Sequence, residues 1–277
     1  MHRGVLRLLR GDDPTLRALI VVAHPDDETL GAGALLQGPS QFTIVHVTDG
    51  APQDPALWST PSADRATYAA ARRAELTRAL LLAGGRPLDV QSLGVLDQEV
   101  VDHIPLVART LALTISTLRP DIVLTHSYEG GHPDHDAVAC AVQGALELVE
   151  RGGGDVPHLL EMAYYHGANG TPTCGRFVTR EGRIEYAVVL STEVHDRKVA
   201  MLDSFVTQRD VLAGFPCDVE RYREGGEYDF GVPPHPGELH YERMGWAVGT
   251  SWRERVRRAA VALAMEATLC PTPAGPS

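Results

Sequence analysis

The sequence contains no long apolar run, and its longest continuous apolar stretches have the length of a single β-strand. A membrane-spanning helix needs about 20 consecutive apolar residues, so we expect no membrane span. Residues 1–10 carry three arginines and lack the apolar segment of a signal peptide. These absences predict a cytoplasmic protein.

Cysteine is also scarce, and the four cysteines form no Cys-x-x-Cys pair. Their wide spacing matches neither a short zinc clip nor the disulfide framework of a small secreted domain. We therefore expect reduced thiols at Cys140, Cys174, Cys217 and Cys270.

Positive charge and aromatic rings are both in short supply. The 277 residues include 36 acidic and 25 basic side chains, with a formal net charge of -11, and aromatics make up 6%. An acidic chain repels phosphate backbones and anionic membrane surfaces, and few rings are available to stack on bases. Nucleic acid is therefore not an expected partner, whereas assembly into a homo-oligomer stays open.

The sequence does contain a regular alternation of strand-like and helix-like segments between residues 18 and 165. Residues 18–23 and 121–125 are dominated by apolar residues, as in strands buried on both faces of a parallel sheet. The alternation predicts an α/β fold with a doubly wound, mostly parallel sheet and helices on both faces. The expected strands are residues 18–23, 42–48, 90–93, 121–125 and 159–165, and the expected helices are residues 29–36, 67–83, 104–118 and 137–150.

The pattern changes after residue 165. The expected elements there are a hairpin of residues 177–179 and 184–190, a helix over 192–205, an irregular Gly- and Pro-rich segment over 214–250 and a basic helix over 252–265. The chain is thus predicted to form a domain over residues 1–210, with an irregular C-terminal extension over 211–277 packed on the same domain. The tail from about residue 271 is expected to be disordered.

Two motifs rich in histidine and aspartate each follow a buried strand. Residues 24–28 read His-Pro-Asp-Asp-Glu after the first strand, and residues 126–136 read His-Ser-Tyr-Glu-Gly-Gly-His-Pro-Asp-His-Asp after the strand at 121–125. In an open parallel sheet, ligands bind at the carboxyl ends of strands, near the point where the strand order reverses. If the two strands are neighbours, these motifs face one another. As an alternative, either motif alone is compatible with a plain strand-to-helix turn.

The residue types in the two motifs indicate a metal site. His24 and Asp27 from the first motif and His135 from the second provide two imidazoles and a carboxylate. A three-ligand set of this kind leaves positions open for water and substrate. Zinc suits the mixture, although iron(II) also accepts two histidines and a carboxylate.

The remaining acids and bases of the motifs are candidates for proton transfer. A metal lowers the pKa of bound water from about 15.7 to roughly 7, and Asp26 is then the expected base. We expect His132 to act as an acid or to stabilise the developing oxyanion, with Asp134 orienting it. Glu28 and Asp136 are also explained by the preference for acids at helix N-termini.

These motifs resemble those of the PIG-L/LmbE-like family of deacetylases. Ala-His-Pro-Asp-Asp-Glu stands at residues 23–28 and His-Pro-x-His at residues 132–135, and the resemblance covers roughly residues 18–210. It implies a Rossmann-like sheet, one Zn2+ ion per chain (Fe2+ being an alternative) and removal of an acetyl group from an N-acetylated amino sugar. By motif match, His24, Asp27 and His135 hold the metal, Asp26 is the general base, and His132 supported by Asp134 assists the reaction.

Weaker correspondences imply substrate contacts. Arg72 stands in an Arg-x-x-Glu pattern with Glu75 and would contact substrate hydroxyls, although an ion pair on a solvated helix face explains the pattern equally well. Asp49 stands in a Thr-Asp-Gly loop expected to line the pocket, and Tyr128 is a candidate for reaching the oxyanion. Residues 233–242 hold two histidines and two acids, and we expect either an ordered loop or a lid over the pocket.

The expected function is therefore hydrolysis of an N-acetyl group on an amino sugar or sugar conjugate. One alternative is an amidase acting on a larger conjugate of the thiol-sugar type, which differs in the pocket size it needs. A second alternative is a non-catalytic relative that binds a ligand, although no ligand or base is missing from the motifs. A two-metal phosphoesterase needs more clustered carboxylates and histidines than these two loops offer.

Overall fold

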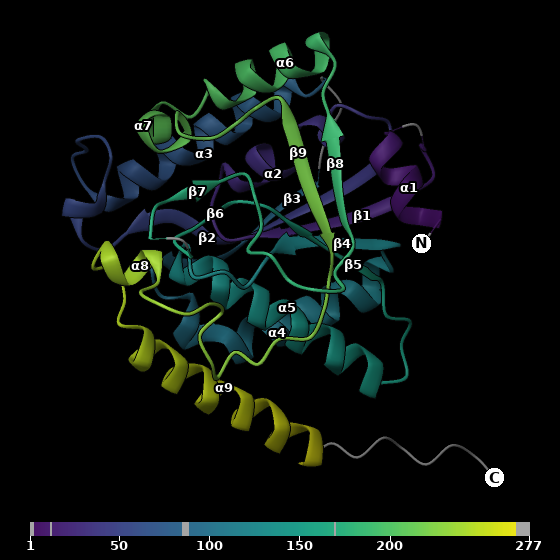
Figure 1. The fold of residues 1–277 in the computed structure, drawn as a ribbon, viewed down its shortest axis with the longest axis vertical. Coiled ribbons are helices and arrows are strands. Elements are labelled where there is room, and N and C mark those ends of the chain that lie inside the picture. Colours follow the sequence, from purple (N-terminus) through teal and green to yellow (C-terminus); the bar gives the residue numbers. More distant parts are fainter. Residues whose placement is uncertain (1–2, 12, 85–88, 169, 270–277) are drawn as a thin grey trace.

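A computed structural model describes residues 3–11, 13–84, 89–168 and 170–269 (Figure 1). The strands are β1 (Arg17–Val22), β2 (Gln41–Pro52), β3 (Asp89–Asp97), β4 (Ile122–His126), β5 (His158–Met162), β8 (Glu185–Val189) and β9 (Val219–Glu224), with a separate small pair of β6 (Tyr165–His166) and β7 (Thr173–Cys174). The central sheet has the order β3-β2-β1-β4-β5-β9-β8. Its first five strands run parallel, and β9 and β8 are each antiparallel to their neighbours. The predicted doubly wound, mostly parallel α/β sheet is confirmed.

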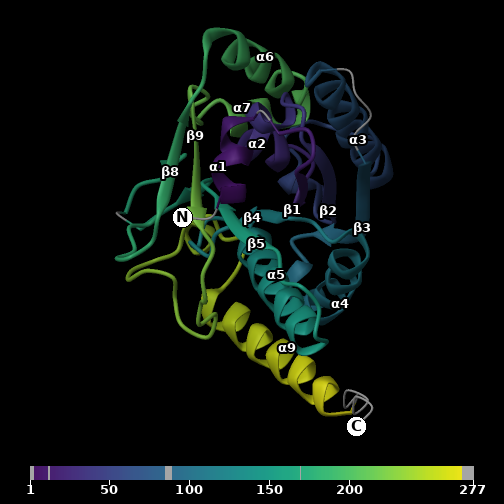
Figure 2. The ribbon, with the colours of Figure 1, turned by 90° about the vertical axis from the view of Figure 1, so that its right-hand side faces the viewer.

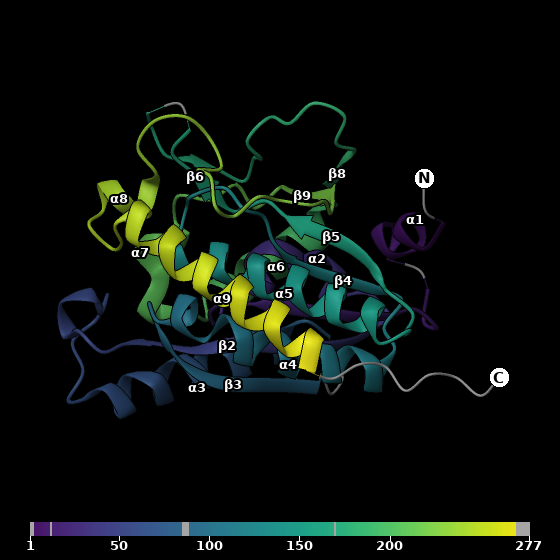
Figure 3. The same ribbon diagram turned by 90° about the horizontal axis from the view of Figure 1, so that it is seen from below.

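Helices cover both faces of this sheet. The longer helices are α1 (Arg3–Arg10), α2 (Asp27–Leu36), α3 (Arg65–Leu82), α4 (Val100–Leu118), α5 (Pro133–Arg151), α6 (Thr192–Leu202) and α9 (Gly249–Leu269), and the short ones are α7 (Arg209–Leu212) and α8 (His240–Arg243). Helices α2, α3 and α6 lie on one face, and α4 and α5 lie on the other (Figures 1 and 2). Figure 3 shows α9 packed outside α4 and α5. In the part of the chain described, no helix is both long and apolar enough to span a bilayer.

The first strand shows how the apolar sequence produces two cores. Side chains alternate between the faces of a strand, so an apolar run supplies both sides of the sheet. Ala18, Ile20 and Val22 join the core under α2, α3 and α6, whereas Leu19, Val21 and Ala23 join the core under α4, α5 and α9. This two-sided burial fixes β1 at the centre of the sheet.

The structure differs from the prediction in the C-terminal half. The predicted hairpin is wrong, because β8 pairs with β9 and not with residues 177–179. The backbone of Val178 instead bonds side chains: its N–H donates to Glu129, and its carbonyl accepts from Arg223. Strand β9 lies inside the sheet, so residues beyond 210 supply an internal strand. The domain boundary near residue 210 stays a prediction, and the tail from residue 271 lies outside the described residues.

A buried ion pair joins α6 to β9. The Lys198 ammonium donates to Glu220 at 2.6 Å and to the carbonyl of Leu30 at 2.8 Å, and both charged side chains are 1% exposed. Glu220 also accepts from the backbone N–H of Ala34 and from the Tyr222 hydroxyl. The pair therefore connects β9 and α6 with α2.

Replacing Lys198 by methionine is expected to lower the free energy of unfolding by about 3–5 kcal/mol, because the Glu220 carboxylate is left buried without its counter-charge. Urea denaturation measures the loss. The matched control is Arg255→Met, since Arg255 pairs with Asp102 at 3.0 Å on the surface. Its removal should cost less than about 1 kcal/mol, and equal losses in the two variants would contradict the assignment.

Candidate active site

The two motifs meet at the point where the strand order of the sheet reverses. Strands β1 and β4 are paired neighbours, and later strands continue outward from each of them in opposite directions. The first motif lies between β1 and α2, and the second lies between β4 and α5. Acidic residues in the first turn of each helix and proline at the start of α5 favour these helix N-termini.

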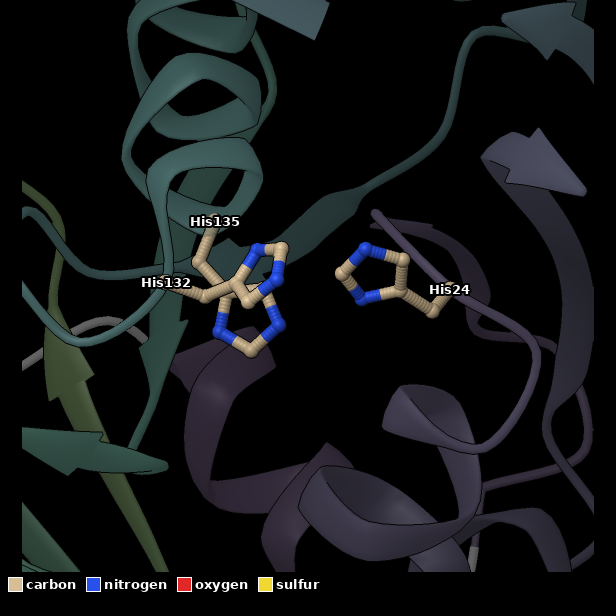
Figure 4. Close-up of side chains that lie close together, drawn as sticks. All are labelled: His24, His132 and His135. Atoms are coloured by element: carbon tan, nitrogen blue, oxygen red, sulfur yellow. The ribbon is translucent and has the colours of Figure 1, made fainter. Parts of the chain in front are cut away.

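Three histidines come together at this place. Figure 4 shows His24 arriving from the loop after β1, with His132 and His135 arriving from the start of α5 and their rings turned toward it. The ring centroids lie 4.7 to 5.3 Å apart, and one ring nitrogen of each lies within 4.8 Å of the others. Asp27 bridges two of them, with its carboxylate 3.3 Å from His24 Nδ1 and 3.2 Å from His135 Nε2. The structure therefore brings the predicted ligands His24, Asp27 and His135 together. The ring of His132 lies about as close to the two other histidine rings as these lie to each other.

The donor set fits a divalent metal ion. Two ligand atoms on a tetrahedral zinc ion, each bonded at 2.0–2.1 Å, lie about 3.3 Å apart, which is the spacing between Asp27 and the two imidazoles. Burial disfavours the charged form of His24, but the carboxylates of Asp97, Asp134 and Asp27 outweigh it and raise its pKa well above the usual value. Positive charge is thus favoured at the centre of this cluster.

A further histidine, His126, contacts this cluster through His135. Its Nε2 accepts the backbone N–H of Ala23 at 2.9 Å, and its ring stacks on His135 with centroids 3.9 Å apart. His126, Asp27 and His135 form a second group of potential ligand atoms. Because the Nε2 lone pair already accepts a hydrogen bond, we assign His126 to holding the His135 ring in place.

Asp26 has a strained backbone that its neighbours hold in place. Its φ angle is 143°, a region that residues with side chains rarely adopt. Glu28 accepts the Asp26 N–H at 3.0 Å and bonds His46 at 2.8 Å. Arg72 donates to the Asp26 carboxylate at 3.2 Å and to the Pro25 carbonyl at 2.9 Å. Burial raises the pKa of Asp26 to about 7, although the Arg72 charge opposes the shift.

The expected relation between His132 and Asp134 differs in the structure. The backbone N–H of Asp134, and not its carboxylate, contacts His132, donating to Nδ1 at 3.2 Å. The carboxylate instead lies 3.4 Å from His24 Nε2 and accepts from the backbone N–H groups of Gln98 and Val100. Nδ1 of His132 is therefore an acceptor, and its Nε2 lies 3.2 Å from the side-chain amide nitrogen of Gln98.

Of the three predicted substrate contacts, the structure places only Arg72 on the cavity. The cavity has a volume of about 200 Å3 and is lined by the motif residues, Arg72 and Gly50. Asp49 does not line it, because its carboxylate pairs with Arg65 at 2.7 Å. Tyr128 does not line it either, because the ring lies in the core under α5 and α9 and its hydroxyl donates to the Val232 carbonyl. The structure thus places neither Asp49 nor Tyr128 on this cavity.

The Arg-x-x-Glu pattern is buried and not solvated. Arg72 and Glu75 are 2% and 3% exposed. Glu75 does not pair with Arg72 but accepts from the backbone and hydroxyl of Thr207. The Nε and Nη1 groups of Arg72 have no hydrogen-bond partner among the residues that the structure describes. Both groups are buried, and Arg72 is one of the residues that line the cavity.

Several cavity residues escaped the sequence prediction. Asp97 ends β3 and lies 3.4 Å from His24 Nε2, and the charges of His24 and His132 lower its pKa to about 2 although burial opposes the shift. Tyr164 follows β5 and donates to the Asp27 carbonyl. Both stand at carboxyl ends of parallel strands, which is the signal that could have found them. Trp246 lies between two helices and does not follow a strand, so no sequence pattern indicates that it lines the cavity.

Comparison with known proteins agrees with the two motifs. Residues 19–146 match the family model described as PIG-L, GlcNAc-PI de-N-acetylase. The matched segment covers a little under half of the chain. The matched range includes the whole of residues 23–28 and 132–135, so both parts of the site lie within the segment that is similar to this family.

Curated relatives and solved structures are also similar to this chain. A probable N-acetyl-alpha-D-glucosaminyl L-malate deacetylase 2 of Bacillus anthracis is 34% identical over 138 residues, or 47% of this chain and 59% of the relative. A 1D-myo-inositol 2-acetamido-2-deoxy-alpha-D-glucopyranoside deacetylase of Mycolicibacterium vanbaalenii is 33% identical over 144 residues, or 44% and 51%. The aligned segments thus span a little over half of each relative. A zinc-inhibited form of teicoplanin deacetylase Orf2 shares the fold, with a TM-score of 0.57, 16% identity and coverage of 76% of this chain and 100% of that chain.

Proposed function

We propose that this protein is a zinc-dependent hydrolase that removes the N-acetyl group from an N-acetylated amino sugar or sugar conjugate. The observation that carries the proposal is the buried group of His24, Asp27 and His135 at the strand-order reversal, with Asp26 and Arg72 lining the same cavity. The PIG-L match over residues 19–146 and the deacetylase relatives support the same reaction.

The ligand set is proposed from the contacts that the residues make. His24, Asp27 and His135 would hold the ion, and His126 and Asp134 would fix the ring positions of His135 and His24. When bound, the metal polarises the amide carbonyl and increases the acidity of water. The Asp26 carboxylate, fixed by Arg72 and by its strained backbone, accepts the proton of the attacking water.

The remaining residues bind and orient the amide. With Nδ1 accepting a backbone N–H, His132 would carry its proton on Nε2 and donate it to the carbonyl oxygen as this gains negative charge. Arg72 lines the cavity, and its guanidinium would donate to sugar hydroxyls, which accept hydrogen bonds. The bond between carbonyl carbon and nitrogen breaks, and the products are acetate and a protonated amine. An amidase on a larger conjugate would use the same residues, so the substrates separate these two alternatives.

A screen for released amine tests the proposal. The metal-loaded enzyme is incubated with a panel of N-acetylated amino sugars and sugar conjugates, with and without a chelator. We expect at least one N-acetylated sugar to give amine, and we expect the chelator to abolish the release and added Zn2+ to restore it. Release that is insensitive to the chelator would contradict the metal assignment. Tight sugar binding without any amine release would favour the non-catalytic alternative.

A further inference from the structure

The cavity has two chemically different ends. Its inner end holds the buried histidines and aspartates of the two motifs. Toward solvent the lining changes to apolar side chains, contributed by Leu57, Val211, Leu212, Phe215 and Trp246. Leu57 and Val211 are 39% and 51% exposed, so they mark the mouth of the cavity. Single exposed apolar residues are ordinary, but a set that converges on one cavity indicates a ligand-binding surface.

Aromatic rings continue from the histidine cluster toward this mouth. Trp246 lies with its ring centroid 5.2 Å from that of His132. On another wall, Tyr165 lies 5.8 Å from His135, and Phe215 packs edge-on against Tyr165 at 5.8 Å. Trp246 and Phe215 are half-buried, so part of each ring is available to a ligand. Aromatic rings thus line this cavity on the His132 side and on the His135 side.

The charges around the mouth disfavour an anionic group. Among the lining residues that the structure describes, Arg72 is the one permanent cation, and it is buried beside Asp26 at the inner end. The nearby Arg65 is paired with Asp49, and the single lysine of the sequence, Lys198, is buried with Glu220. The lining residues therefore offer a carboxylate or phosphate at the mouth no counter-charge besides the buried Arg72, and the exposed Arg209 of α7 is not among them.

We infer that the mouth is a subsite for an uncharged aryl aglycone, attached to the N-acetylated amino sugar whose amide the inner end holds. The inference rests on the proposed function and adds the chemical class of the aglycone, which is the part of the substrate attached to the sugar. Leu57 and Val211 cover the edges of the aryl ring, while Trp246 and Phe215 provide its aromatic contacts. The region after residue 210, whose role the sequence leaves open, thus supplies part of the specificity.

Steady-state kinetics and calorimetric binding with the metal-loaded enzyme test the inference. The substrates are the phenyl, hexyl, methyl and carboxyphenyl glycosides of N-acetylglucosamine. We expect kcat/KM for the phenyl glycoside to exceed that for the methyl glycoside by about tenfold or more. The carboxyphenyl glycoside should fall to the level of the methyl glycoside or below, and the hexyl glycoside should lie between phenyl and methyl.

Two substitutions locate the subsite. Val211→Asp and Trp246→Ala should each reduce the ratio of kcat/KM between phenyl and methyl glycosides to about two or less, mainly through KM. The matched control is Val261→Asp, a similarly exposed valine on α9 outside the cavity, which should leave the ratio at its wild-type value. Val211 lies on the exposed side of α7, so this variant tests the subsite even if loss of the half-buried Trp246 ring impairs folding.

The outcomes separate this inference from the proposed function. Phenyl and methyl glycosides that bind and react equally would overturn the subsite and leave the deacetylase proposal intact. A preference for the carboxyphenyl or hexyl glycoside would also overturn it, since the mouth would then favour an anion or an alkyl chain. Tighter binding of the phenyl glycoside without amine release would support the subsite and count against the proposed reaction.

Discussion

The Asp26→Asn variant is expected to lose deacetylation by a factor of about 10²–10⁴ in kcat while keeping its metal. Asparagine has the size of aspartate and can still accept the Arg72 hydrogen bond, but it cannot take a proton from water. Acetate and amine release measure the rate, and elemental analysis measures the metal. KM should change little, because Asp26 is assigned to proton transfer and not to binding.

The control for this variant is Asp49→Asn. Asp49 is also an aspartate near the cavity, toward the end of β2, but its carboxylate pairs with Arg65 and does not line the cavity. We expect Asp49→Asn to retain kcat within about threefold, in line with the small effect of a partly exposed ion pair. Full activity in Asp26→Asn, or an equal loss in both variants, would show that the base has been assigned to the wrong residue.

Removing a proposed ligand should remove the metal itself. His135→Ala and Asp27→Ala each delete one of three protein ligands, and loss even of a supporting residue typically lowers metal affinity by about 10–100-fold. We therefore expect the metal content per chain to fall from about one equivalent to well below half after dialysis. Activity should fall with it and return only partly at high Zn2+ concentration.

His195→Ala is the matched control for the ligand variants, because His195 is a partly exposed histidine on α6 that contacts Asp196. Its metal content should equal that of the wild type. Circular dichroism and thermal unfolding of the metal-free proteins show whether each variant still folds. Unchanged metal stoichiometry in folded His135→Ala would refute the ligand set and point to the neighbouring His132 in its place.

The sequence predicts the centre of this molecule well because the centre is built from local patterns. The apolar run at residues 18–23 corresponds to β1, and its two-sided burial follows from its composition. The motifs are placed correctly because each directly follows a strand, and parallel strands bring their carboxyl ends to one edge. The adjacency of β1 and β4 then decides that His24 and His135 meet.

The prediction fails for side chains whose orientation depends on which side of the chain they pack against, or on a partner that the local sequence does not indicate. Tyr128 follows β4 closely, but its ring packs against Trp252 of α9, more than 100 residues later, and so faces the core. Asp49 is drawn away from the cavity by Arg65, an ion pair that spacing along the chain does not reveal. The segment predicted to be irregular contains strand β9. Its pairing with β5 and β8 depends on tertiary contacts that the local sequence pattern does not reveal.

The most direct test of the central claim is hydrolysis of an N-acetylated amino sugar by the metal-loaded enzyme in water labelled with oxygen-18. We expect amine and acetate in equal amounts, with the acetate carrying a single labelled oxygen, and we expect neither product in the presence of a chelator. Amine formed without labelled acetate, or equal product formation by the metal-free enzyme, would contradict attack of water on the amide at the centre formed by His24, Asp27 and His135.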